Sequence, residues 1–268
     1  MKKVKRGYKR RTIEKILGGV FTQWKKSIED ENLAKLVENN TIITGGAIAS
    51  MLLGEKVNDY DLYFTDKDTT KAVAEYYVSK IDGNKDIEVK EDADGRITIY
   101  IPSEGQAKAE AKGKYSPVYM TSNAITLTNK IQLVLRFYGD ADAIHENYDF
   151  VHCTNYWTSK SGELVLRVKA MESLMSRDLK YQGSKYSVCS VMRIRKFVKR
   201  GWTINAGQVL KILFQVSQLD LTNIEVLKDQ LTGVDSAYFE GMIYSLKSAD
   251  PDKVDLTYAA ELIEEIFG

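Results

Sequence analysis

The chain has 268 residues and a formal net charge of +1, which suits one large domain or two modest ones. Its two cysteines, Cys153 and Cys189, argue against a disulfide scaffold and favour a reducing, cytoplasmic compartment. Its two histidines, His145 and His152, are too few for a zinc site with four protein ligands. Any bound metal should therefore be a hard ion held by oxygen atoms.

Hydrophobic periodicity and turn signals predict a mixed first half. The chain is expected to begin with a basic arm over 1–11 and helices over 12–28 and 32–38. The stretch 41–64 is expected to form a strand, a glycine turn, a helix and a second strand, followed by a helix to 80 capped by Thr65 or Asp66. Further strands are expected over 86–90, 96–101, 124–127, 131–138, 149–157 and 163–168, with an exposed loop over 107–114 and a short helix over 141–146. We expect neither a signal peptide nor a membrane-spanning segment.

The second half reads as helices only. They are expected over 170–179, 187–199, 206–219, 224–231, 238–248 and 256–266. Apolar residues predicted to face the core are Val188, Val191, Ile194 and Val198 in the second of these helices and Val209, Leu210, Ile212, Leu213, Phe214 and Val216 in the third. The fold class is therefore α+β: a mixed sheet domain with flanking helices over 41–168, preceded by the arm and helices of 1–40 and followed by an all-helical domain over 169–268.

Two aspartates mark the second strand of the 41–64 stretch. Asp59 and Asp61 are two residues apart, so on a strand they point to one face, opposite the apolar Tyr60, Leu62 and Phe64. Two carboxylates about 6 Å apart repel by about 2–3 kcal/mol at an effective dielectric near 20. This pattern predicts that a cation offsets the repulsion, next to the glycine turn.

A strand, then Gly45-Gly46, then Asp59-Tyr60-Asp61-Leu62 resembles the signature of the polymerase-beta-type nucleotidyltransferases. The run from Gly45 to Gly54 is most similar to the head domain of CCA-adding and poly(A) polymerases, and the chain also has the character of phage-encoded nucleotidyltransferase-like proteins. The resemblance covers about residues 40–155 and implies a nucleotidyltransferase fold for the mixed domain.

The resemblance also implies a third carboxylate on a later strand. Asp149 is chosen because it follows a helix and opens an apolar run. Asp59, Asp61 and Asp149 would then bind two Mg²⁺ ions, with Mn²⁺ as a possible substitute, which hold the triphosphate and activate a hydroxyl. Gly45 and Gly46 would let backbone N–H groups approach the phosphates, with Ser50 nearby.

The helical half is expected to supply further nucleotide contacts, as in that superfamily. Lys185, Arg193 and Lys196 lie in a basic region that runs from Arg177 to Arg200. A solvated helix face is an equally simple interpretation of these charges.

The sequence also departs from the CCA-adding pattern. Ala49 and Ser50 stand where those enzymes have Arg and Asp, and their Arg-Arg-Asp-Phe element has only a distant counterpart in Ser122–Thr126. These differences argue against CCA addition itself.

The expected function is transfer of NMP from an NTP, ATP or CTP first, to an acceptor hydroxyl. The basic arm favours an RNA acceptor with a tRNA-like 3′ end. Two alternatives stay open: transfer to a protein or small molecule, as in toxin and antibiotic-modifying relatives, and a catalytically silent nucleic-acid-binding or virion-associated protein on the same scaffold.

Overall fold

The computed structural model describes residues 6–81, 87–101, 106–108, 113–221 and 223–231. The chain divides into two compact units, Met1–Ser176 and Arg177–Gly268. The sequence places the border near residue 168, before helix α6 (Val168–Ser176), which lies in the first unit. The helices expected over 238–248 and 256–266 lie outside the described residues. In the described part, no helix combines the length and hydropathy needed to cross a bilayer.

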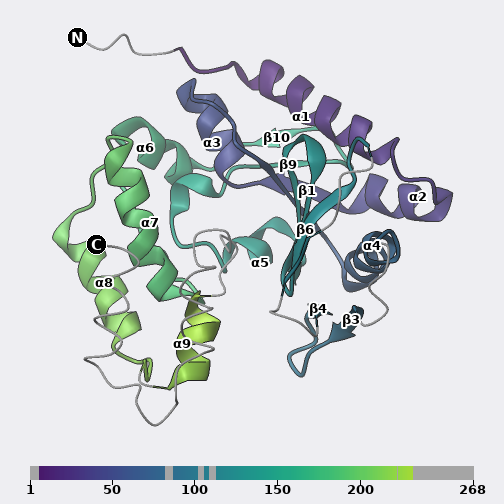
Figure 1. Cartoon of the computed structure of the whole chain (residues 1–268). Helices are drawn as coiled ribbons and strands as arrows, with labels where there is room; N and C mark the ends of the chain where they lie inside the picture. Colours follow the sequence, from purple (N-terminus) through teal and green to yellow (C-terminus); the bar gives the residue numbers. More distant parts are fainter. Residues whose placement is uncertain (1–5, 82–86, 102–105, 109–112, 222, 232–268) are drawn as a thin grey trace. The chain divides into compact units, whose positions relative to one another are not determined.

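The first unit contains an eight-stranded mixed sheet of order β10-β9-β1-β2-β8-β7-β6-β5 (Figure 1). Strand β2 runs parallel to β8, whereas the other neighbouring pairs are antiparallel. The strands are β1 (Thr41–Thr44), β2 (Tyr60–Phe64), β5 (Gln106–Lys108), β6 (Pro117–Thr121), β7 (Ala124–Leu127), β8 (Ile131–Tyr138), β9 (Tyr156–Thr158) and β10 (Leu164–Val165). A separate hairpin joins β3 (Glu88–Glu91) to β4 (Ile97–Tyr100).

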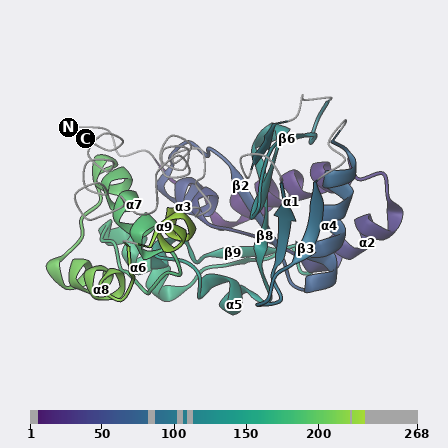
Figure 2. The same cartoon turned by 60° about the horizontal axis from the view of Figure 1, so that its bottom comes forward.

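One face of this sheet is apolar and buried. A row of directly paired side chains crosses seven strands and is almost fully excluded from solvent: Leu164, Trp157, Ile43, Leu62, Leu133, Ile125 and Met120. The helices that cover it are α1 (Arg10–Lys25), α2 (Glu31–Asn40), α3 (Gly46–Leu53) and α4 (Lys67–Ser79), which share one core with it (Figures 1 and 2). Side chains alternate along a strand, so the residues one position away form the opposite face.

Local hydrogen bonds fix the ends of these helices. Asp30 caps α2 through the N–H groups of Asn32 and Leu33, and Asp66 caps α4 through the N–H of Thr69. Of the two caps considered for α4, Asp66 is therefore confirmed.

Two predicted elements of the sheet are wrong. Residues 149–157 do not form one strand, because local bonds shape a 3₁₀ turn, η2 (Val151–Cys153), before β9 begins. The Oδ1 of Asp149 accepts the N–H of Phe150, and these short-range bonds replace a strand ladder. The loop expected over 107–114 contains the end of β5, which pairs with β6 as the edge strand.

The second unit contains α7 (Ser187–Lys199), α8 (Ala206–Val216) and α9 (Ile224–Leu231). The predicted core stripe of α7 is wrong, since Val191 and Val198 are 45% and 50% exposed. That helix instead buries Cys189, Ser190 and Phe197.

The prediction for α8 is also largely wrong. Ile212 is buried, but Phe214 is 69% exposed, and Leu210 and Leu213 are each more than half exposed. Within the part of the chain that the structure describes, Ile212 is the one buried side chain of this helix, and Val209 and Val216 are half-buried.

Candidate active site

The glycine turn lies against the carboxylate of Asp61. Gly45 has φ 88° and ψ −152°, a conformation open essentially to glycine alone. A Cβ added there would lie 2.8 Å from Oδ2 of Asp61 and 3.4 Å from the hydroxyl of Tyr148. A Cβ added at Gly46 would meet nothing within 4 Å. The chain thus turns from β1 into α3 directly over Asp61, and only the first glycine is sterically required.

The face on which Asp61 lies agrees with the sequence prediction. Asp61 is half-buried and pairs with Thr44 on β1, whereas Leu62 and Phe64 enter the core on the other face. Asp59 is exposed and lies just before the first residue of β2 rather than within it. The parallel neighbour β8 places the amide of Gln132, not a carboxylate, directly beside Asp61.

Two tyrosines border the Asp61 carboxylate. The ring of Tyr148 lies 6.1 Å from that of Tyr63, two residues beyond Asp61 on β2. Burial raises the pKa of Tyr148 well above its ordinary value, and the neighbouring Tyr63 and Asp61 raise the pKa further. Tyr148 is therefore a neutral phenol at physiological pH.

A buried histidine holds the end of β1. Nε2 of His145, on α5 (Ala141–His145), is 2.8 Å from Oγ1 of Thr44, the residue before the glycine turn. The His145 ring also lies edge-on to Tyr148, with centroids 5.0 Å apart. Burial lowers the pKa of His145 to about 4, an effect strengthened by the charge of Arg167 and opposed by Asp142. His145 is thus a neutral structural partner of the turn.

Arg167 brings a positive charge to this cluster. Its guanidinium lies 5.3 Å from the ring centroid of Tyr156, which pairs with Thr44, and Nη2 is 2.6 Å from Oδ1 of Asp142. Its backbone N–H donates to Oδ1 of Asn155, whose carbonyl accepts from the Thr44 hydroxyl. Neither Arg167 nor Tyr148 stands in a motif, so sequence analysis missed both. The topology brings Tyr148 beside Gly45 and Arg167 beside Tyr156, the strand partner of Thr44.

Asp149 follows Tyr148 directly and is 8% exposed. Its Oδ1 accepts the N–H of Phe150. Within the described ranges, no three His, Cys, Asp or Glu side chains form a group that could hold a metal ion. The role of Asp149 as third ligand therefore stays a prediction. Asp59 and Asp61 offer the oxygen donors that Mg²⁺ prefers, and Mg²⁺ commonly needs only one or two protein carboxylates beside substrate phosphates and water.

Comparison with known proteins identifies the family. A family model described as "Gad2: Gabija anti-defense 2 family protein" matches residues 16–177, more than half of the chain and including the entire glycine turn and aspartate strand. The chain belongs to the Gad2 family.

A curated relative and two solved structures add context to the family assignment. The relative, "Gabija anti-defense 2" of Bacillus phage SPbetaL7, is 23% identical over 224 residues, which is 82% of this chain and 48% of the relative. The chain thus spans about half the length of that relative. The Thermotoga maritima CCA-adding enzyme complexed with tRNA_CCA aligns over 90% of this chain and 53% of its own, with 14% identity and a TM-score of 0.43. The Bacillus stearothermophilus CCA-adding enzyme in complex with CTP aligns over 77% and 49%, with 12% identity and a TM-score of 0.40.

The remaining predicted nucleotide contacts of this Gad2-family chain belong to α3 and to the second unit. Ser50 is buried within α3, where its carbonyl accepts the N–H of Glu55. Lys185, Arg193 and Lys196 belong to the second unit, in and just before α7, and the carbonyl of Lys185 accepts from Gln230. The first unit thus brings together Gly45, Gly46 and Asp61, and the assignments of Ser50 and the three basic residues stay predictions.

Proposed function

We propose that this Gad2-family chain is a Mg²⁺-dependent nucleotidyltransferase that transfers NMP from an NTP to a hydroxyl of an RNA acceptor. The observation that carries the proposal is the contact between Gly45 and the Asp61 carboxylate at the start of α3. It brings the N-terminal end of α3 beside a carboxylate, and these are the two kinds of group that would bind a metal-bound triphosphate.

The proposed reaction is a displacement at the α-phosphorus of the NTP. The acceptor oxygen forms a bond to the α-phosphorus as the bond to the bridging oxygen of the β-phosphate breaks, so pyrophosphate leaves and the hydroxyl proton passes to solvent. Asp59 and Asp61 would hold the metal, which supplies charge neutralisation on the triphosphate. Catalysis then depends on positioning rather than on a histidine base, which agrees with the neutral, structural His145.

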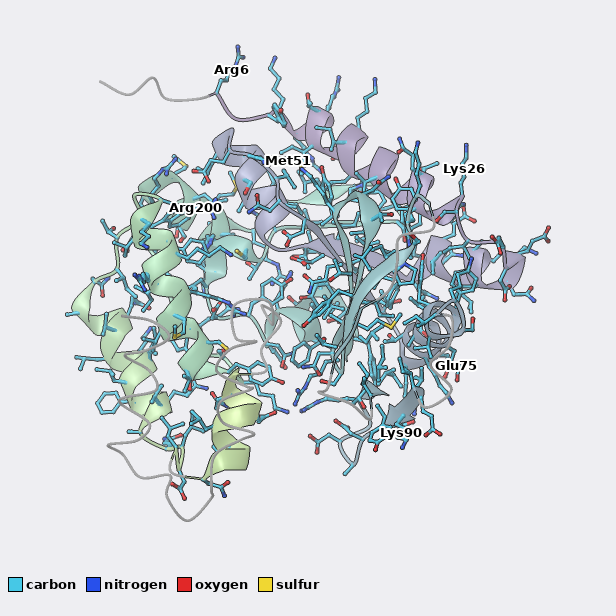
Figure 3. All side chains as sticks on the ribbon, viewed as in Figure 1. Arg6, Lys26, Met51, Glu75, Lys90 and Arg200 are labelled. Carbon is cyan, nitrogen blue, oxygen red and sulfur yellow. The ribbon has the colours of Figure 1, made fainter. Side chains whose placement is uncertain are left out.

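Charges of the first unit support phosphate and nucleic-acid binding. Arg167 is the candidate for a triphosphate contact, because Asn155 anchors it to the strand that enters the glycine turn. Exposed basic side chains also follow α1, including Arg10 and Arg11, and Figure 3 shows Lys26, just after the end of this helix, on the outside of the first unit. Because α1 covers the face opposite Asp61, these charges fit the body of a polynucleotide rather than its reacting end.

The family name of the relative gives the biological setting of the proposal. A phage protein called Gabija anti-defense 2 acts, by its name, against a defence system, and we extend that role to this chain. The site of action would be the cytoplasm of the infected cell. The modified molecule would be an RNA that the defence system uses or monitors.

The experiment is incubation of the full chain with each α-labelled NTP, total RNA and Mg²⁺, Mn²⁺ or EDTA, followed by sizing of the labelled product. We expect metal-dependent label in an RNA band, and its loss in Asp61→Asn. Asp94→Asn is the matched control, since Asp94 lies in the β3–β4 turn, is exposed and pairs with Arg96.

Three results would contradict parts of the proposal. Label in protein or in small molecules would show that the acceptor belongs to another class of molecule. Transfer that persists in Asp61→Asn would show that Asp61 is not part of the active site. RNA binding without any transfer, for all four NTPs and both metals, would make the chain a silent scaffold.

A further inference from the structure

The face of the sheet that carries Asp61 holds a continuous row of polar side chains. Register pairs Asp61 with Gln132 on β8, Gln132 with Thr126 on β7, and Thr126 with Tyr119 on β6. One position along each strand, the paired residues are Leu62, Leu133, Ile125 and Met120, all buried under the helices. The sheet is therefore two-sided, and its polar side extends from Asp61 toward β6.

The two sides of Asp61 differ along this row. Toward β1 and β9 the face is covered, because His145 of α5 contacts Thr44 and Tyr156. Toward β8, β7 and β6, Gln132, Thr126 and Tyr119 are each partly exposed. Those three steps of the sheet span about 14 Å at the usual strand spacing. A ligand that reaches Asp61 from this direction crosses the strands over these side chains.

The chemistry of the three residues suits nucleobases. Gln132 offers an amide, which can bond to two adjacent atoms of a base edge. Thr126 offers a hydroxyl, and Tyr119 a ring on which a base can stack, as on the sheet surfaces of RNA-binding domains. None of the three is charged, so they suit contacts with bases better than contacts with phosphates. A duplex keeps its bases stacked and paired, so an unpaired end fits this row better.

We propose that Gln132, Thr126 and Tyr119 bind the last unpaired nucleotides of a single-stranded RNA 3′ end and lead its terminal hydroxyl to Asp61. This inference deepens the proposed function and rests on it for the identity of the reacting end. The binding itself does not require transfer, so the two can be tested separately.

The test measures binding of the full chain to a labelled single-stranded RNA oligonucleotide, by fluorescence anisotropy without NTP. We expect Tyr119→Ala and Tyr119→Leu to weaken binding about tenfold or more, whereas Tyr119→Phe keeps the ring and the affinity. The salt dependence of binding should be unchanged in all three, because no phosphate contact is lost. Gln132→Leu should alter the preference among oligonucleotides that differ only in their last bases.

The matched control is Tyr100→Ala. Tyr100 is 49% exposed on the separate β3–β4 hairpin, where its ring lies 3.9 Å from Nζ of Lys90. We expect it to bind like the wild type. Melting temperatures of all variants identify any that fold poorly, and Tyr119→Leu retains apolar volume if the alanine variant does not fold.

The outcomes separate this inference from the proposed function. Equal binding by Tyr119→Leu, Tyr119→Phe and Tyr100→Ala would contradict RNA binding by the polar row, even if transfer to RNA is seen. Ring-dependent binding with no transfer supports the row and contradicts the proposed function. A blunt duplex that competes as well as a single strand, a DNA strand that binds more tightly than RNA, or transfer to protein that ignores Tyr119, also overturns the row.

Discussion

The backbone of Gly45 and the carboxylate of Asp61 pack so closely that no side chain fits between them. A Cβ on Gly45 would lie 2.8 Å from Oδ2 of Asp61. The two residues are 16 positions apart in sequence but adjacent through the pairing of β1 with β2. The turn that would hold phosphate and the carboxylate that would hold metal are thus one rigid unit, and a change in one displaces the other.

The two glycines give a matched pair of substitutions. Gly45→Ala should destabilise the protein by about 1–3 kcal/mol, because its backbone conformation is essentially restricted to glycine and the new methyl meets Asp61. Gly46→Ala should fold with an unchanged melting temperature, since nothing lies within 4 Å of its Cβ. If Gly46 lets a phosphate approach, that variant should still bind NTP more weakly. Urea unfolding and NTP titration of both variants test this, and equal stability loss in the two would contradict it.

The charge of Asp61 should matter for ligands and not for folding. Without metal, Asp61→Asn should leave the melting temperature unchanged or raise it, because repulsion from Asp59 is reduced. Mg²⁺ with NTP should raise the melting temperature of the wild type and not of this variant. Thermal scans with and without ligand give the answer. A loss of several kcal/mol in the apo variant would instead make Asp61 a structural hydrogen-bond centre.

The sequence predicted the elements whose signals are local. Strand β8 and helix α7 have the predicted bounds, and the glycine turn with Asp61 on the polar face is as expected. The strand and the helix are identified because each contains a complete hydrophobic repeat, and the turn is identified because its backbone conformation requires glycine. Periodicity also predicts too many buried residues in apolar helices: Val198 and Phe214 fit a core stripe but are exposed.

The rest of the site depends on contacts that a linear pattern does not contain. Tyr148 approaches the glycine turn, and Arg167 approaches the neighbouring Tyr156, because η2 and β9 bring their segments to β1. The polar row depends on how four strands pair, from β2 through β8 and β7 to β6. The sequence indicated a loop over 107–114 and no strand at β6, so this pairing could not be predicted from it. The strand spacing of Asp59 and Asp61 predicted a cation, whereas the need for a third ligand came from the resemblance, and Asp149 was chosen for its place between a helix and an apolar run.

Arg167 should act on nucleotide binding. Arg167→Lys keeps the charge but loses the planar donor pair, so it should raise the KM for NTP severalfold with little change in kcat. Asp142→Asn removes the carboxylate that lies 2.6 Å from the guanidinium and should lower that KM or leave it unchanged. Steady-state kinetics at fixed acceptor concentration test both. A fall in kcat alone for Arg167→Lys would contradict a phosphate contact.

The contact between α1 and α4 should contribute measurably to stability. Nε1 of Trp24 donates to the hydroxyl of Tyr77 at 2.9 Å in the buried core, so Tyr77→Phe leaves that donor unsatisfied and should cost about 1–3 kcal/mol. Tyr76→Phe is the matched control, because the hydroxyl of Tyr76 accepts the exposed N–H of Glu29 and water can replace it. We expect a change of about 0.5 kcal/mol or less for the control. Equal effects in urea unfolding would refute the assignment.

The buried His145 should make the first unit sensitive to acid. Because its pKa falls from the ordinary 6.5 to about 4 on folding, the unfolded state binds more protons between these values. The part of the unfolding free energy that depends on neutral His145 is therefore largest above about pH 6.5, and it decreases by about 3 kcal/mol in total as the pH falls toward 4. His145→Gln keeps a polar partner for the Thr44 hydroxyl but cannot titrate. The difference in unfolding free energy between wild type and variant, measured by urea at several pH values, should shift in favour of the variant by that amount across this window. A difference that stays constant with pH would show that His145 is not held neutral by the fold.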